Sequence, residues 1–242
     1  QELNNFTISR TAFHPVTLSP YIPGSAIKGA LRTAYLNGQQ HAKNPGKMRF
    51  PADLEKTLLD GGSFHTDPFR LLKVSDFYPV GPCNASIVFA VNEKKTPSKF
   101  QARGPYQILE VIEPGAIFLG TIQIVPPLTT EIIKTPLTTK SLLDSCQNFY
   151  MREKLREDDE LADIAIPKTV SVKKGGILMR LGRHSGAECL TIEGQRHIRI
   201  MQGKGNPPTW NSEGATTFWL AAEASAKYDK KKLSPFGWTS LE

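Results

Sequence analysis

Cysteine is scarce in this chain of 242 residues, and the three that occur, Cys83, Cys146 and Cys189, stand far apart with no C-x-x-C pair. Neither a disulfide framework nor a thiolate zinc site is expected from this spacing. The chain also lacks an apolar run that approaches the roughly 20 residues needed to cross a bilayer. Its first ten residues lack the charged-then-apolar order of a signal sequence. These absences favour a reducing, cytoplasmic compartment and no membrane partner.

The motifs of common phosphate and metal chemistry are absent as well. Neither G-x-x-x-x-G-K-[ST] nor G-x-G-x-x-G occurs. Metal-assisted cleavage of a phosphodiester calls for clustered acidic ligands, whereas the stretch "HTDPFRLLKVSDF" (65–77) offers only Asp67 and Asp76, nine residues apart. We interpret Asp67, beside Pro68, as a turn or cap residue and Asp76 as structural. The sequence therefore predicts no metal site, no cofactor and no catalytic residue of this kind.

Positive charge is in excess. Lys and Arg number 30 against 23 acidic residues, which gives a formal net charge of +7 and a pI near 9.3. Such an excess favours a polyanionic partner, although a basic protein without such a partner explains the charge alone equally well. Hydrophobic residues at 39% and aromatic residues at 9% are ordinary for a folded domain and exclude a disordered chain.

Two helices are predicted in the first quarter of the chain. The first covers about Ser25–Asn37 and ends at Gly38, and the second begins at Pro51 and ends before Gly61. Between them, residues 38–50 are expected to form a polar, basic loop.

Strands dominate the middle of the chain. The second half of the stretch 106–125 places Phe118, Ile122 and Ile124 on one face and Thr121 and Gln123 on the other, so one face of this sheet is expected to be more polar. Strands are predicted at 4–13, at 84–92, twice within 106–125 around a turn at Pro114-Gly115, at about 197–201 and at 216–222.

Residues 137–162 show the longest helical pattern, with Leu142, Cys146, Phe149 and Tyr150 on one stripe. The charged end of this helix, Arg152–Glu160, is interpreted as a solvated surface. Strands interleaved with a few helices indicate the α+β class.

The stretch "PGSAIKGALR" is the first candidate site. Its apolar residues repeat with a helical period and would dock on a sheet. Lys28 and Arg32 are four residues apart on a different face, where two like charges cost a few tenths of a kcal/mol in an isolated helix. A phosphate backbone would explain this pair, because the exposed N–H groups near Gly24 and Ser25 add to the two cations. Ordinary solubilising cations are the alternative.

The stretch "KKGGILMRLGRHSGAECLTIEG" is the second candidate site. Glycines let a backbone approach a ligand and direct its N–H groups at an anion, and the interleaved cations would neutralise phosphates. A glycine-rich turn without a ligand is the alternative. The residues selected as RNA-binding candidates here are Lys174, Arg180, Gly182, Arg183, His184 and Gly186.

His14 and His184 are the candidate general bases. Neither has a carboxylate or a nucleophile at an informative spacing, and histidines in basic loops are more often solvated or in contact with RNA than catalytic.

Five motifs, in order, carry a resemblance to a known family: "PYIPGSAIKGALRTA" (20–34), "DPFRLLKVSDF" (67–77), "LEVIEPGAIFLGTI" (109–122), "RLGRHSGAECLTIEG" (180–194) and "SPFGW" (234–238). The chain resembles the RAMP superfamily of CRISPR-associated proteins over about residues 8–238. More narrowly, it resembles the subunit of type III-A (Csm) interference complexes at the backbone end nearest the guide RNA 3′ end.

This resemblance implies an RRM-like, ferredoxin-like (βαββαβ) fold with one core module and a second, partial or degenerate module. The N-terminal module would cover residues 1–135, with a first strand expected before residue 1. Residues 136–242 would form a helical insertion and a β-rich part with the glycine-rich loop.

The resemblance also implies a function. The subunit would be non-catalytic, would bind the guide (CRISPR) RNA, and would cap the backbone beside other RAMP subunits in antiviral defence. It would help to define where host nucleases trim the guide 3′ end. The alternative is a RAMP-type, metal-independent endoribonuclease that processes precursor guide RNA with His14 or His184 as acid or base.

Overall fold

The computed structural model describes residues 7–98, 104–128, 132–168, 175–202 and 205–242. Three α-helices lie in these ranges, α1 (Gly24–Lys43), α2 (Pro51–Leu58) and α3 (Thr139–Asp163), together with the short 3-10 helices η2 (Pro68–Leu71), η3 (Glu188–Leu190) and η4 (Lys230–Lys232). The strands are β1 (Ile8–Ser9), β2 (Leu72–Val74), β3 (Tyr78–Pro79), β4 (Ala85–Lys94), β5 (Gln107–Ile112), β6 (Phe118–Leu119), β7 (Ile122–Ile124), β8 (Ile177–Arg180), β9 (Ile198–Ile200), β10 (Thr209–Asn211), β11 (Thr217–Ala222), β12 (Ser234–Pro235) and β13 (Trp238–Leu241).

The largest sheet has five strands in the order β1-β5-β4-β11-β12. Strand β1 runs parallel to β5, while β5, β4, β11 and β12 pair antiparallel. Because α1 follows β1, and β4 and β5 follow α1, this order has the βαββ arrangement of a ferredoxin-like module. The α+β prediction is confirmed.

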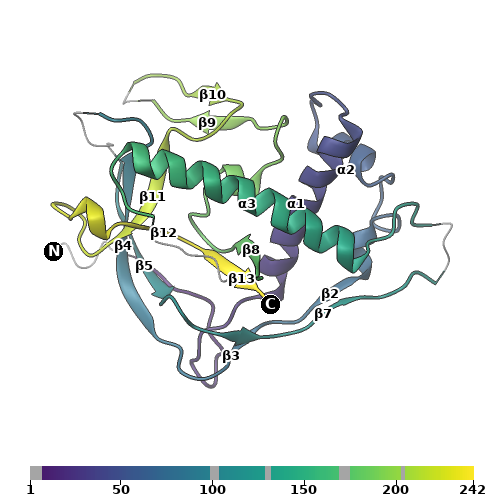
Figure 1. The fold of residues 1–242 in the computed structure, drawn as a ribbon, viewed down its shortest axis with the longest axis horizontal. Coiled ribbons are helices and arrows are strands. Elements are labelled where there is room, and N and C mark those ends of the chain that lie inside the picture. Colours follow the sequence, from purple (N-terminus) through teal and green to yellow (C-terminus); the bar gives the residue numbers. More distant parts are fainter. Residues whose placement is uncertain (1–6, 99–103, 129–131, 169–174, 203–204) are drawn as a thin grey trace.

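Four two-stranded sheets complete the fold, β2–β7, β3–β6, β8–β13 and β9–β10. In Figure 1 the β9–β10 hairpin lies at the upper edge of the view and the β2–β7 pair runs along the lower right. Helices α1 and α3 pack against each other and cross between the β9–β10 hairpin and the β2–β7 pair.

Helix α1 forms on the apolar stripe that the sequence predicts. Ile27, Leu31, Ala34 and Tyr35 are all buried. The predicted end at Gly38 is wrong, because the helix continues to Lys43 and stops where Asn44 takes a left-handed conformation (φ 43°).

Gly38 does not end the helix. It allows α1 and α3 to approach each other closely. A Cβ at this position would lie 2.8 Å from Ser145 Oγ of α3. Residues 38–43 are therefore helical, and only the remainder of the predicted loop 38–50 lies between α1 and α2.

Helix α3 begins as the sequence indicates. The Thr138 side chain accepts from the Ser141 amide and the Ser141 side chain accepts from the Thr138 amide, which forms a capping box. The predicted stripe is buried, and the hydroxyl of its Tyr150 donates to the Ala30 carbonyl of α1 at 3.1 Å.

The charged end of α3 is not a solvated surface, so that prediction is wrong. Glu153, Lys154 and Glu157 are buried. Glu153 and Glu157 form ion pairs with cations from other segments, which a sequence pattern alone does not reveal, and Lys154 pairs with Asp158 of the same helix. The pairs include Glu153 with Arg196 (2.5 Å) and Glu157 with Arg180.

The middle strands agree with the sequence. Gly115 has a φ of +95°, as the turn after Pro114 requires. Phe118, Ile122 and Ile124 pack against the core, whereas Thr121 and Gln123 are exposed, so the prediction of a more polar face is confirmed.

Strands β9 and β11 confirm the predictions at about 197–201 and 216–222. At the amino end, the predicted strand 4–13 is reduced to Ile8–Ser9 and an isolated bridge between Phe13 and Pro20, and residues 4–6 lie outside the described ranges.

The division at residue 135 stays a prediction. Strands β11 and β12, from the C-terminal part, join the same sheet as β4 and β5. Among the described residues no helix is both long and apolar enough to cross a bilayer.

Candidate nucleic-acid interface

Helix α1 starts where the chain packs tightly against the segment after β2. A Cβ at position 24 would lie 2.4 Å from the carbonyl oxygen of Ser75, so only glycine fits there. The Gly24 amide donates to the Asp76 carboxylate at 2.8 Å. Asp76 is therefore structural, as predicted, and its negative charge already lies at the positive end of the helix.

An open groove of about 520 Å³ runs beside this helix start. Ser25 is exposed on α1, and Ser75 and Thr121 are exposed on the two chain segments opposite. The groove is lined by Gly24, Ser25, Lys28, Leu72, Lys73, Val74, Ser75, Thr121 and Gln123. Three hydroxyl groups and two cations thus line one hollow.

Lys28 and Lys73 supply the positive charge of this groove. The Lys28 ammonium donates to the Leu72 carbonyl at 2.7 Å. Burial lowers the pKa of Lys28, and the neighbouring charge of Lys73 lowers it further. A phosphate placed between the two ammonium groups would pair with both and relieve the repulsion between them.

Arg32 does not project into solvent beside Lys28, so that premise is wrong. Its guanidinium pairs with Glu55 at 2.6 Å and with Asp67 at 2.8 Å, and it lies over the Phe69 ring. The repulsion expected between Lys28 and Arg32 is thus offset inside the protein. Asp67 also accepts from the Phe69 amide, which confirms its predicted role as a cap.

The glycine-rich loop follows β8 and turns through left-handed conformations at Gly182 (φ +85°), His184 (φ +62°) and Gly186 (φ +77°). Gly182 is exposed with open space beside it. Arg183 is exposed and donates to the Ser9 hydroxyl at 2.9 Å. Gly182 and Arg183 are the parts of this loop that a ligand can reach.

His184 and Arg180 face inward. The His184 ring stacks on Trp219 with 4.5 Å between centroids, and its Nε2 is buried with no hydrogen-bond partner. Burial lowers the pKa of His184 to about 4, and Arg183 contributes to this shift. The Arg180 side chain is 3% exposed, pairs with Glu157 and donates to the Phe236 carbonyl at 3.0 Å.

The predicted residues therefore divide into separate groups. Gly24, Ser25 and Lys28 share the groove, whereas Gly182 and Arg183 lie beside β1. The four cations Lys28, Arg32, Arg180 and Arg183 do not form one exposed track, because Arg32 and Arg180 are engaged by carboxylates. Gly186 is half-buried, and Lys174 lies outside the described residues.

Sequence reasoning missed Lys73 and Ser75. A signal was present, because alternation along the strand places both on one face and Gln123 is opposite Lys73 in the register of β2 with β7. In the structure, the Ser75 amide donates to the Thr121 carbonyl at 3.0 Å, so the polar face predicted for Thr121 and Gln123 meets Lys73 and Ser75 at the groove.

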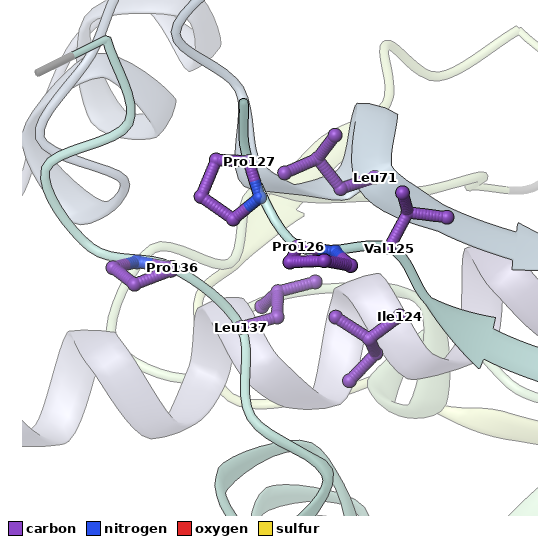
Figure 2. A pocket seen from close by; sticks show the side chains of 7 residues that line it. All are labelled: Leu71, Ile124, Val125, Pro126, Pro127, Pro136 and Leu137. Carbon is purple, nitrogen blue, oxygen red and sulfur yellow. The ribbon is translucent and has the colours of Figure 1, made fainter. Parts of the chain in front are cut away.

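A second hollow, of about 250 Å³, is apolar. Figure 2 shows its lining, which is made of Leu71, Ile124, Val125, Pro126, Pro127, Pro136 and Leu137. None of these side chains can neutralise a phosphate, so this hollow does not suit a nucleic acid backbone.

In the part of the chain that the structure describes, no cluster of three or more His, Cys, Asp or Glu side chains could hold a metal ion. His14 accepts through Nδ1 from the amides of Val16 and Thr17, both at 3.3 Å. This histidine therefore stabilises its own turn.

The sequence model of the RAMP superfamily matches residues 4–164. The chain belongs to the RAMP superfamily. The matched region contains the helix and the strands that line the groove. No curated protein matches the chain.

Among the solved structures that match this chain, two illustrate the shared fold. The first is a chain of the cryo-EM structure of a Csm–crRNA–target RNA ternary complex in a type III-A CRISPR-Cas system. It is 19% identical with a TM-score of 0.66, and the alignment covers 99% of this RAMP chain and 77% of that chain.

The second is the crystal structure of T. onnurineus Csm5, 19% identical with a TM-score of 0.52, over 88% of this chain and 74% of that chain. The mixed sheet with few helices is thus the RAMP fold that these proteins share.

Proposed function

We propose that this RAMP protein is an RNA-binding subunit of a type III-A (Csm) CRISPR interference complex. The observation that carries this proposal is the likeness, over 99% of the chain, to a protein from a Csm–crRNA–target RNA complex. The net charge of +7 and the cationic groove support an RNA partner.

The groove beside α1 is the first proposed contact with the guide RNA. Lys28 and Lys73 would pair with phosphates, and the hydroxyls of Ser25, Ser75 and Thr121 could donate to phosphate or sugar oxygens. The exposed loop at Gly182 and Arg183 would be a second contact, because its amides and its guanidinium are open to a ligand.

The role within the complex is to cap the backbone near the guide RNA 3′ end, beside other RAMP subunits. In this position the protein would help to define where host nucleases stop trimming. Such a complex works in the cytoplasm as part of antiviral defence, which agrees with the sparse cysteines of the chain.

The subunit is proposed to be non-catalytic. A general acid or base must reach the proton that it transfers. His184 Nε2 is buried behind its stack on Trp219, and His14 Nδ1 accepts two backbone amides. No contact of either histidine favours the endoribonuclease alternative.

A gel-shift and cleavage assay tests both parts of the proposal. The purified protein is incubated with a 5′-labelled, single-stranded guide-like RNA and with a precursor of the same RNA, with and without Mg²⁺. A mobility shift with both RNAs intact is expected. Cleavage that is lost in the His14→Ala or His184→Ala variant would establish the endoribonuclease, and the absence of any shift would contradict RNA binding.

Reconstitution tests the capping role. Guide RNAs recovered from complexes that lack this subunit are expected to have longer and more variable 3′ ends than guides from complete complexes. Identical 3′ ends in the two preparations would contradict the role.

A further inference from the structure

The β9–β10 hairpin has an exposed face with an aromatic ring and a cation side by side. Trp210 is directly opposite Arg199 in the antiparallel register, so both side chains lie on one face of the hairpin. His197 and Met201 share this face by alternation along the chain. All four residues are exposed, Trp210 to 55% and Met201 to 72%.

The Trp210 indole is held in one orientation. The His197 ring stacks on it with 4.1 Å between centroids and 5° between planes. More than half of the Trp210 surface still faces solvent. A large aromatic surface that is both ordered and exposed is ready to accept another flat ring without a further loss of side-chain entropy.

The chain segment that carries this ring has positive charges and no negative ones. No acidic residue occurs between positions 195 and 212. Arg196 of this stretch is buried and pairs with Glu153, so it is not available to a ligand. Arg199 is exposed, and no ion pair to it occurs among the described residues.

We propose that this face binds single-stranded RNA, with an unpaired base stacked on Trp210 and a neighbouring phosphate paired with Arg199. Proteins that hold single strands combine aromatic platforms with cations in this way, because every base has a π face and every linkage carries a charge. An apolar protein partner would not explain a cation next to the ring. The proposal rests on the proposed function for its ligand, but this contact is separate from the groove beside α1.

Paired oligonucleotides separate base stacking from phosphate binding. The probes are hexaadenylate and an abasic hexamer with the same number of phosphates, each with a fluorophore for anisotropy. The Trp210→Ala variant is expected to bind hexaadenylate about 5- to 150-fold more weakly than the wild type, and to bind the abasic hexamer within about twofold of the wild type. Trp210→Phe, which keeps an aromatic face, should retain most of the affinity.

Ile87→Ala is the matched control, because Ile87 is exposed to 54% on β4 and has no aromatic ring. It should leave both affinities unchanged. Arg199→Ala should make the plot of log affinity against log salt concentration shallower by about 0.7, the value for one phosphate on a single strand. Thermal unfolding of each variant shows that the fold is kept.

The possible outcomes are distinct. If the wild type binds RNA but Trp210→Ala binds hexaadenylate as tightly, this inference fails and the proposed function stands. If Trp210→Ala weakens the binding of hexaadenylate and of the abasic hexamer equally, the proposed base stacking on Trp210 is overturned. If Trp210→Ala releases other subunits from the complex at unchanged RNA affinity, the face binds protein and the inference fails. No binding of either probe by the wild type overturns this inference and the proposed function together.

Discussion

Arg180 and Glu157 form an ion pair in the protein interior, where their side chains are 3% and 2% exposed. The Trp238 indole donates to the other oxygen of Glu157 at 2.6 Å, and the Arg180 guanidinium lies over the Trp238 ring. The pair thus connects α3, β8 and β13. An arginine of the glycine-rich segment that looks available to RNA in the sequence instead fixes the base of the loop.

Removing the charge of Glu157 should destabilise the fold. Glu157→Gln leaves the buried Arg180 without a counter-ion, and the free energy of unfolding is expected to fall by about 3–5 kcal/mol. Urea denaturation measures this change. Lys140→Ala breaks an exposed pair with Asp144, in which Lys140 is 86% exposed, and should change stability by less than about 1 kcal/mol. Equal losses in the two variants would contradict the interior role of Glu157.

Glycines at two positions of α1 should respond to alanine in opposite ways. Gly24→Ala forces a Cβ against the Ser75 carbonyl and should cost about 1–3 kcal/mol of unfolding free energy. Gly29→Ala, where nothing lies within 4 Å, should stabilise the protein by about 0.5–1 kcal/mol, because alanine favours the helix. Denaturant midpoints compare the two, and stabilisation by Gly24→Ala would disprove the close packing.

Stability should depend on pH through His184. Its pKa is about 4 in the folded state against an ordinary value of 6.5, so the unfolded chain binds more protons between these values. The free energy of unfolding should therefore fall as the pH decreases from 6.5 towards 4. His184→Asn, which tolerates the positive φ, should lose less stability than the wild type between pH 7.5 and pH 5. Parallel pH profiles would refute this account.

Substitution of Arg32 should lower the stability of the fold and leave the RNA affinity unchanged. Arg32→Ala removes ion pairs to Glu55 and Asp67 and should lower the free energy of unfolding by about 1–2 kcal/mol. The salt dependence of RNA binding should stay that of the wild type. A shallower salt dependence in this variant would place Arg32 at the RNA.

The sequence predicts helices and strands correctly where a local periodic pattern of apolar and polar residues determines them. The stripe of α1 and the polar face with Thr121 and Gln123 are examples, because each depends on local alternation. The prediction is wrong where a contact with a residue far away in the sequence determines the structure. Gly38 resembles a helix end until Ser145 packs against it, and Glu153 resembles a surface residue until Arg196 reaches it.

The candidate site is only partly predictable for the same reason. Gly24, Ser25 and Lys28 were found from the helix start, but Lys73 becomes their neighbour only when β2 lies beside α1. Arg32 is a candidate from its spacing to Lys28 and Arg180 from its place among glycines, but carboxylates from other segments engage both.

The salt dependence of RNA affinity in a Lys28→Ala/Lys73→Ala variant tests the central claim most directly. Its control is Lys140→Ala/Lys232→Ala, which removes the same charge from exposed pairs with Asp144 and Glu223. If the groove beside α1 holds two phosphates of a single strand, the slope of log affinity against log salt concentration should become shallower by about 1.4 in the groove variant and stay unchanged in the control. Equal slopes in the two double variants would contradict the assignment of this groove to RNA.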